Sequence, residues 1–526
     1  MRVLPAVKSH WITMHRKRAS AMVDMHGRGQ WSRRSFLTAT AAASVTLAAC
    51  ARDSSVVVPN NAIADAEARR PHSGRTVSAT LTADRARVDL GGTVAETVSY
   101  NGTVPGPLVR ASVGDELAVT VRNRLDRTTS VHWHGIALRN DMDGASPATP
   151  DIVAGSDFTY RFSVPHPGTY WAHPHTGLDA DTGLYFPVIV DDPNEPGSYD
   201  AEWVVMLDDW TDGVGSSPAQ IYDGLRNSPG GHNMPGMDMP GMSGMGTVPG
   251  VGGAGTSTLL GGDAGDVSYP YYMVNGRIPQ APSTFRVKPG HRVRIRLINS
   301  GSDTAFRVAL AGHKLTVTHT DGFAVVPTDV DAVLIGMGER YDVVVTAGDG
   351  VFPLVAAAEG KNASARALLV SGSGTPPATD YVPPELQGRV GTVATFAAAP
   401  GAALPKARAD ADLPAELGGG MMNYDWSING MPFSTTRPLE VHQGQRITLS
   451  FRNTSMMWHP MHLHGHTFEV LTADGRPGAR KDTVIVLPMQ QLRVTFDADN
   501  PGEWMLHCHN TYHQEAGMMT SLNYIG

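Results

Sequence analysis

Histidines recur in four short motifs whose spacing suits metal binding. His132-Trp133-His134 and His173-Pro174-His175 each place two imidazoles two residues apart, and further histidines lie in residues 459–465 and 507–513. On an extended strand, residues i and i+2 project from the same face, so each pair forms half of a metal site. One such pair alone is more often a surface or structural feature. Four motifs in one chain predict a centre that holds several ions.

The tripeptide His507-Cys508-His509 is the most specific of these motifs. In a strand, Cys508 points to one face and its two neighbours point to the other, so the tripeptide can contact two metal centres at once. Two histidines, a thiolate and a weak axial methionine form a blue-copper site, which cycles between Cu(I) and Cu(II). The residues that provide this set are His459, Cys508, His513 and Met518.

The remaining candidate ligands are all imidazoles. They are His132, His134, His173, His175, His462, His464, His507 and His509. Imidazole suits copper, and a set of this size can hold three ions. Zinc is the main alternative, but a structural zinc needs only four ligands and a catalytic zinc three plus water. The combined motifs exceed what zinc requires, so the sequence predicts copper.

A strand unit that occurs three times must position these ligands. Each copy has an Asn-Gly turn (Asn101, Asn275 and Asn429), an extended stretch, a Gly, an alternating strand and then Asn. The alternating apolar residues are Leu117, Val119 and Val121, then Val293, Ile295 and Leu297, then Ile447, Leu449 and Phe451. This alternation predicts half-buried antiparallel strands with one face in solvent. Three copies predict three β-sandwich domains.

Composition supports an all-β fold and sets the domain boundaries. The chain has 526 residues with 57 Gly and 37 Pro, which favours many turns and short strands over long helices. Turn-rich stretches at 191–197 and 372–384 predict domains over 76–195, 196–380 and 381–526. The net charge of -8 gives no basic surface for nucleic acid. Cys50 and Cys508 are the only cysteines, so no disulfide framework is expected.

Residues 1–50 have the pattern of an export signal. Arg33-Arg34 precedes an apolar run of small residues over 38–49, which resembles a twin-arginine signal and predicts a bacterial periplasmic or cell-envelope location. Cys50 ends a sequence that resembles a lipobox, although a chance cysteine after a cleavage site is an equal alternative. The natural start is Met1, Met22 or Met25. Residues 51–75 are expected to be a linker.

Gly, Met, Pro and Ser make up most of residues 230–262. Such a composition cannot build a core, and we expect a mobile surface loop of the middle domain. Five methionines recur in it at short intervals, and soft thioethers bind Cu(I). They are Met234, Met237, Met239, Met242 and Met245. A flexible linker without a binding role is the alternative.

Taken in order, the four motifs resemble those of three-domain multicopper oxidases, the family of laccases and bacterial cuprous oxidases. The resemblance covers about residues 80–526 and implies three cupredoxin-like Greek-key β-sandwich domains with four copper ions. It implies that His459, Cys508, His513 and Met518 hold type 1 copper, that His132 and His462 hold type 2, and that His134, His173, His175, His464, His507 and His509 hold the type 3 pair. The cluster then lies between the first and third domains, and the middle domain supplies no ligand.

The resemblance also implies a reaction. A donor gives single electrons to type 1 copper, Cys508 passes them through His507 and His509, and dioxygen is reduced to water. Asp143 matches an acid that helps deliver protons in similar enzymes, although a turn residue in Asp141-Met142-Asp143-Gly144 is the alternative. Gln514 stands where relatives often carry Glu, and Glu515 follows it.

The methionines favour Cu(I) as the donor and a role in copper tolerance. Met457, beside Met456, matches a substrate-site methionine of cuprous oxidases, but Ser455 stands where they often have an acid. Packing of both methionines in the core is the alternative. Oxidation of small phenols or aromatic amines is the alternative activity. A copper-storage or copper-delivery protein leaves the full ligand set unexplained, and a copper nitrite reductase does not need the His-Cys-His bridge.

Overall fold

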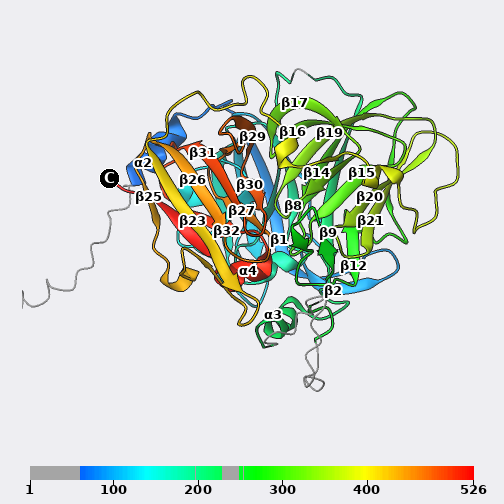
Figure 1. The fold of residues 1–526 in the computed structure, drawn as a ribbon, viewed down its shortest axis with the longest axis horizontal. Coiled ribbons are helices and arrows are strands. Elements are labelled where there is room, and N and C mark those ends of the chain that lie inside the picture. The colour runs from blue at the N-terminus through cyan, green and yellow to red at the C-terminus, as the bar shows by residue number, and fades with distance from the viewer. Residues whose placement is uncertain (1–59, 196, 228–247, 253) are drawn as a thin grey trace, which may run out of the picture. The chain divides into compact units, whose positions relative to one another are not determined.

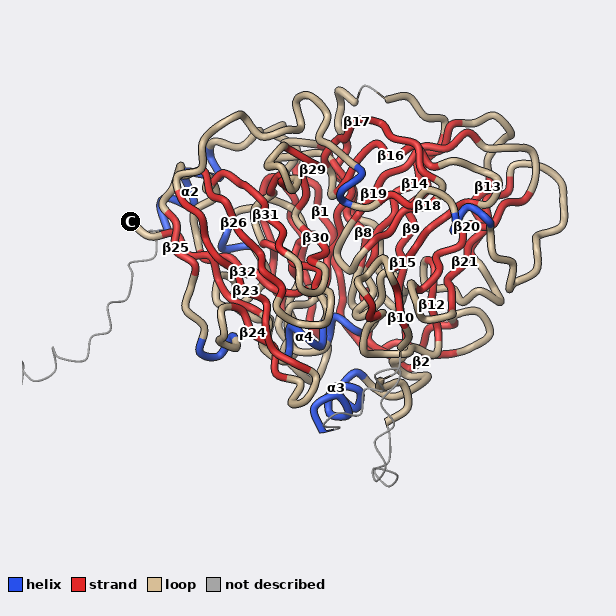
Figure 2. Tube along the Cα trace, viewed as in Figure 1, coloured by secondary structure: helices blue, strands red, loops and turns tan. Residues whose placement is uncertain are grey.

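The computed structural model describes residues 60–195, 197–227, 248–252 and 254–526. Strands dominate this part of the chain and helices are few (Figure 2), which confirms the all-β fold class. The twin-arginine motif, Cys50 and the methionines between 234 and 245 lie outside the described residues. None of the helices in the described part of the chain has the length and apolarity that a bilayer crossing requires.

The first domain contains two sheets of four strands each. One has, in spatial order, β2 (Val94–Tyr100), β1 (Thr76–Asp89), β4 (Glu116–Asn123) and β6 (Asp157–Ser163). The other has β3 (Val109–Ser112), β8 (Phe186–Asp191), β7 (Gly168–His173) and β5 (His132–His134). Buried apolar side chains from both sheets form one core, as a sandwich requires.

The middle domain has two larger sheets. One orders β12 (Tyr271–Val274), β9 (Ala201–Trp210), β14 (Arg292–Asn299), β19 (Arg340–Thr346), β16 (Leu315–Thr320) and β17 (Phe323–Val330). The other orders β13 (Ser283–Arg286), β21 (Ala363–Val370), β20 (Val351–Ala358), β15 (Phe306–Leu310), β18 (Ala332–Ile335) and β22 (Val390–Gly391). A short hairpin of β10 (Thr256–Ser257) and β11 (Gly262–Asp263) lies outside both sheets.

The third domain repeats the two-sheet arrangement. One sheet orders β24 (Asp425–Ile428), β23 (Ala411–Gly420), β26 (Arg446–Asn453), β31 (Gln491–Asp497), β28 (Phe468–Leu471) and β29 (Pro477–Lys481). The other orders β25 (Leu439–Val441), β33 (Met519–Tyr524), β32 (Glu503–Cys508), β27 (His459–Leu463) and β30 (Thr483–Val486). Figure 1 shows these strands beside those of the middle domain. The described α-helices are α2 (Asn60–Ala68), α3 (Pro218–Asn227) and α4 (Thr511–Glu515).

The repeated unit has the same local structure in all three copies. Its strands are β4, β14 and β26, and their alternating apolar residues are all buried. In each Asn-Gly turn the asparagine has a positive φ, between 51° and 56°, a conformation that Asn and Gly adopt most readily. Each of these asparagines also accepts a hydrogen bond from a strand N–H at 2.7–2.8 Å. The repeated Asn is therefore a side-chain link between the turn and its neighbouring strand.

Two features of these strands differ from the expectation. Each has one parallel neighbour as well as an antiparallel one, because β1, β9 and β23 run alongside them in the same direction. In β14, Arg294 and Arg296 are buried on the face that was expected to be in solvent. Both arginines pair with Asp342 of β19, and Arg296 also donates to Thr169 Oγ1 of β7. This face packs against the first domain, so the charges are paired instead of solvated.

Part of the Gly- and Met-rich segment is also more ordered than expected. Residues 254–262 belong to the described chain and include β10 and the start of β11. Leu260 is fully buried and packs in a small apolar cluster with Trp458 of the third domain. The expectation of a coreless loop over 230–262 is therefore wrong for this end of the segment.

Candidate metal centre

The histidine motifs lie on two pairs of neighbouring strands, one in the first domain and one in the third. β5 pairs with β7, so His132 lies opposite His173. β27 pairs with β32, so His462 lies opposite His507. The two pairs face each other, because His132 Nε2 lies 3.4 Å from His462 Nε2.

All eight histidines that remain after the blue-copper set gather in this one cluster. Their Nε2 atoms approach in pairs, at 3.3 Å for His175 and His507, 3.0 Å for His464 and His507, and 3.3 Å for His173 and His509. The ring of His134 stacks on that of His462 with 3.7 Å between centroids. Several trios of these histidines bring their ring nitrogens within 4.8 Å of one another, which is a separation that one ion can bridge.

The outer nitrogens of these rings are held by fixed acceptors. Nδ1 of His132, His173, His462 and His507 lies 2.8–3.0 Å from a main-chain carbonyl oxygen, to which it donates. A neutral imidazole that donates from Nδ1 carries its lone pair on Nε2. Lone pairs that face each other across about 3 Å repel unless a cation lies between them. The donor set therefore fits metal ions inside the cluster.

The electrostatics keep these imidazoles in their metal-binding form. Burial, followed by the neighbouring imidazoles, lowers the pKa of the rings well below the usual value. This applies to His134, His173, His464, His507 and His509. The same causes lower the pKa of His175 to about 3. The rings are therefore neutral near neutral pH, and neutral imidazole is the form that binds metal.

His134 is oriented the other way round. Its Nε2 lies 3.0 Å from Thr483 Oγ1 and 3.2 Å from Asp482 Oδ1, so this nitrogen is already hydrogen-bonded. In the pairs of rings described above, Nε2 is instead the nitrogen that points into the cluster. Its Nδ1 has no hydrogen-bond partner in the described part of the chain. Nδ1 is therefore the nitrogen of His134 that is left for a metal.

The predicted blue-copper residues gather in a second buried group. His459 Nδ1 and His513 Nδ1 lie 3.1 Å apart, and Cys508 Sγ lies 3.6 Å and 3.7 Å from them. Met518 is fully buried, and its main chain bonds to both Cys508 and His513. Cys508 thus faces this group, while its neighbours His507 and His509 belong to the cluster. The thiolate and two imidazoles suit copper.

The Nε2 atoms of both histidines in this group also have hydrogen-bond partners. His459 Nε2 lies 2.8 Å from Ser455 Oγ, and His513 Nε2 lies 3.0 Å from Asp266 Oδ2. Burial lowers the pKa of His513, but hydrogen bonds with Asp266 and Cys508 reverse this and raise it to about 10. The middle domain, through Asp266, therefore contacts a ring of the blue-copper group.

The other predicted site residues have different environments. Asp143 is 1% exposed and its Oδ2 lies 2.8 Å from His464 Nδ1, so it contacts the cluster directly. Met456 is 65% exposed, whereas Met457 is 3% exposed and packs in the core. Gln514 lies in α4 with its side chain half-buried, and Glu515 is exposed.

Sequence reasoning missed three charged residues at these groups. They are Asp266, Arg340 and Asp482, and all three are buried. The available signal was weak: Asp482 directly precedes the apolar strand β30, and Arg340 begins β19. Charged residues at the ends of apolar strands are common on surfaces, so burial was needed to single these out.

A thiolate–imidazole group joined through one tripeptide to an eight-histidine cluster defines a copper protein that moves electrons between two centres. Profiles described as multicopper oxidase match residues 82–195, 201–374 and 409–525. Multicopper oxidase MmcO of Mycobacterium tuberculosis is 62% identical, and the match covers 94% of this chain and 97% of that protein. The chain belongs to the multicopper oxidase family.

Other relatives agree. A copper resistance protein A homolog of Pseudomonas syringae pv. tomato is 30% identical over 83% of this chain and 90% of that protein. The solved laccase of Botrytis aclada is 25% identical with a TM-score of 0.70, covering 91% of this chain and 93% of that one. The protein is therefore an oxidoreductase that couples oxidation of a donor to reduction of dioxygen. Its family uses one type 1, one type 2 and two type 3 copper ions.

Proposed function

We propose that the donor is Cu(I) and that the protein serves copper tolerance. Four Cu(I) ions give four electrons, which with four protons reduce dioxygen to two water molecules. When bound, the copper ions take up the electrons singly and supply them together to dioxygen. In this proposal His459, Cys508, His513 and Met518 hold type 1 copper. His132 and His462 hold type 2, and His134, His173, His175, His464, His507 and His509 hold the type 3 pair.

The observation that carries the choice of Cu(I) is where the methionine-rich stretch attaches. Before residues 228–247, Tyr222 of α3 packs on Tyr424 with 6.5 Å between ring centroids. Tyr424 OH donates to Asp266 at 2.7 Å, and Asp266, which follows the stretch, contacts His513. Asp266, which follows the stretch, therefore contacts the candidate type 1 group directly, and Tyr222, which precedes it, is connected to that group through Tyr424. Thioethers are soft ligands and suit Cu(I) as the donor.

The names of relatives and the exposed Met456 also support this donor. Proteins named copper resistance protein A, from Escherichia coli and Pseudomonas syringae pv. tomato, are 27–28% identical to the chain. Met456, which is 65% exposed, adjoins Ser455, whose hydroxyl contacts His459. A donor that binds at Met456 is therefore one residue from a side chain that contacts the type 1 group.

The protein chain performs the binding and proton steps. Cys508 of the candidate type 1 group is joined by peptide bonds to His507 and His509 of the cluster. Electrons therefore have a short path through covalent bonds between the two groups. Asp143, buried against His464, is the side chain proposed to hold and pass protons at the cluster. Main-chain carbonyls and Asp482 fix the ring orientations, so little reorganisation is needed during turnover.

The proposal extends to location and domain limits. We propose that Arg33-Arg34 directs export by the twin-arginine route to the bacterial cell envelope, and that Cys50 anchors the mature chain to lipid. The proposed domains remain 76–195, 196–380 and 381–526. Export in the folded state suits a protein whose ligands come from two separate domains.

The test is oxygen uptake by the copper-loaded protein with Cu(I) or a phenol as the donor. Rapid uptake with Cu(I), and phenol oxidation only after Cu(II) is added, is the expected result. Rapid phenol oxidation without Cu(II) and none of Cu(I) would make the protein a laccase. Copper that is retained without any oxygen uptake would indicate storage or delivery instead.

A variant tests the methionines in the same assay. The combined substitution keeps the apolar volume and removes the thioethers: Met234→Leu, Met237→Leu, Met239→Leu, Met242→Leu and Met245→Leu. We expect the KM for Cu(I) to rise about tenfold while turnover of a Cu(II)-mediated phenol stays unchanged. The phenol is the internal control for intact copper centres. An unchanged KM for Cu(I) would remove the methionine stretch from the proposal.

A further inference from the structure

We infer that Arg340 is a positioning residue for the histidine cluster: it acts through Asp482 and fixes the hydrogen-bonding edges of His134 and His462. Arg340 belongs to the middle domain, which supplies none of the proposed copper ligands. The inference rests on the proposed function, because it assumes that the cluster holds copper. It gives the middle domain a part in the geometry of the cluster.

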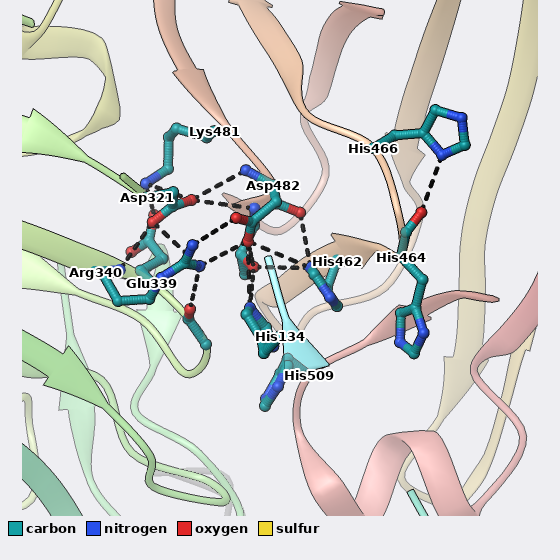
Figure 3. A network of polar contacts seen from close by, with 12 residues as sticks. His134, Asp321, Glu339, Arg340, His462, His464, His466, Lys481, Asp482 and His509 are labelled. Atoms are coloured by element: carbon teal, nitrogen blue, oxygen red, sulfur yellow. Dashed lines mark hydrogen bonds and ion pairs between the residues drawn. The ribbon is translucent and has the colours of Figure 1, made fainter. Parts of the chain in front are cut away.

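Arg340 and Asp482 form a bidentate salt bridge between the middle and third domains (Figure 3). Its Nη1 donates to Oδ1 at 2.7 Å and its Nη2 to Oδ2 at 2.6 Å, and both side chains are fully buried. Such a fork fixes the plane of the carboxylate as well as its place. The guanidinium also holds the pKa of Asp482 well below its usual value, against the opposing effect of burial.

Asp482 in turn contacts two cluster histidines. Its Oδ1 lies 3.2 Å from His134 Nε2, and its main-chain oxygen accepts from His462 Nδ1 at 2.9 Å. Thr483 Oγ1, which bonds to Asp482 Oδ1 at 2.8 Å, lies 3.0 Å from the same His134 nitrogen. The carboxylate plane set by Arg340 therefore decides that Nε2 of His134 points outward and Nδ1 inward.

The loop that leads into Arg340 also contacts the histidine cluster. A Cβ on Gly338 would lie 2.8 Å from His134 Cε1 and 2.9 Å from His509 Cδ2, so only glycine fits there. Gly338 also has φ +82°, which glycine adopts without strain. Its carbonyl accepts from Arg340 Nη1 at 3.0 Å. The middle domain thus forms one wall of the cluster and anchors it.

Other charges in the network keep Arg340 in place. Asp321 accepts from the Arg340 main-chain N–H at 2.8 Å and lies 3.1 Å from Lys481 Nζ. Glu339 lies 3.2 Å from the same amine. Arg340 Nε donates to the main-chain oxygen of Thr169 in the first domain at 2.9 Å. Arg340 therefore contacts groups from all three domains.

The test compares two buried arginines in the full-length, copper-loaded protein. Arg340→Lys keeps the charge but cannot form the bidentate salt bridge with Asp482. Arg294→Lys is the matched control, because Arg294 is also buried and paired with Asp342 at 2.6 Å but belongs to another ion-pair group. The measurements are copper per chain during a chelator titration, the electron paramagnetic resonance spectrum of type 2 copper, and the blue absorbance of type 1 copper.

In Arg340→Lys we expect type 2 and type 3 copper to be lost at about 10- to 100-fold lower chelator concentration, with an altered type 2 spectrum and an unchanged blue absorbance. Arg294→Lys should match the unmodified protein in all three. Normal type 2 copper in Arg340→Lys would overturn the inference. So would equal loss of type 1 and cluster copper, which would mean a general folding defect. If the unmodified protein held no type 2 copper, the proposed function itself would fail.

Discussion

Asp143 touches two histidines of the cluster from a fully buried position. Its Oδ2 accepts from His464 Nδ1, and its main-chain oxygen accepts from His132 Nδ1 at 3.0 Å. A carboxyl at this place can orient a ligand and also exchange a proton, whereas a turn residue would face solvent. The burial therefore favours a part in the reaction over a part in the turn.

The amide in Asp143→Asn can still accept the His464 hydrogen bond but cannot carry a proton. We expect full copper content and a kcat that falls by about 10²- to 10⁴-fold. Oxygen uptake and copper analysis on the same sample check this. Asp141→Asn is the control, because the Asp141 side chain is 43% exposed and pairs with Arg139. Loss of copper in proportion to loss of kcat would show that Asp143 only orients the ligand.

All twelve proposed ligands are candidates from the sequence alone, because they fall in short motifs with fixed spacings. Three of the buried charged residues around these ligands could not be predicted. Asp482 and Arg340 are 142 positions apart and meet only because β19 and the end of β29 come from adjacent domains. Asp266 is 247 positions from His513. No local pattern marks such pairs, since their contact depends on how whole sheets pack.

The five-residue helix α4 carries His513 and depends on its cap. The Asn510 side chain accepts from the N–H groups of Tyr512 at 3.0 Å and His513 at 3.2 Å. Its amide donates to Asp303 Oδ1 at 2.7 Å, which ties the helix to the middle domain. So short a helix is unstable alone, and these bonds fix the direction of the His513 ring.

Asn510→Ala removes the cap and should cost about 1 kcal/mol of stability. Because the loss falls on α4, we expect type 1 copper to be removed by a chelator at about fivefold lower concentration, with type 2 copper unchanged. Blue absorbance and the type 2 spectrum separate the two. Asn510→Ser keeps an acceptor for the cap and should lie closer to the unmodified protein. Identical behaviour of the Ala and Ser variants would contradict this role.

The core strands of each domain could be predicted because alternation with period two is a strong local signal. Their parallel neighbours β1, β9 and β23 could not, since strand order depends on the path of the chain between strands. The burial of Arg294 and Arg296 also escaped prediction. It depends on the contact between the middle and first domains, and alternating charged residues normally face solvent.

His166 lies where the three domains meet. Its ring is half-buried, 5.4 Å between centroids from Phe323 of β17, and Arg480 of β29 lies over the same phenyl ring at 4.1 Å. Burial, and then the positive charges of Arg480 and Arg70, lower its pKa to about 4. The unfolded chain, with an ordinary value of about 6.5, therefore binds this proton more readily than the folded protein does.

The free energy of unfolding should consequently decrease as pH falls from about 6.5 to about 4, and His166 should contribute on the order of 2 kcal/mol to that decrease. Above pH 6.5 the ring is neutral in both states and contributes no slope. Urea titrations of the unmodified protein and His166→Gln at several pH values measure the difference. Parallel pH profiles for the two would contradict the effect.

The cluster joins parts of the chain that are synthesised far apart. His132 and His462 are separated by 330 residues, and His173 and His509 by 336. Closing such long loops is slow and entropically costly, so these contacts form late in folding. Until then the first domain presents four histidines without their partners from the third domain. Such an incomplete ligand set can bind other divalent ions. The complete ligand set of the cluster therefore exists only once the third domain has docked on the first.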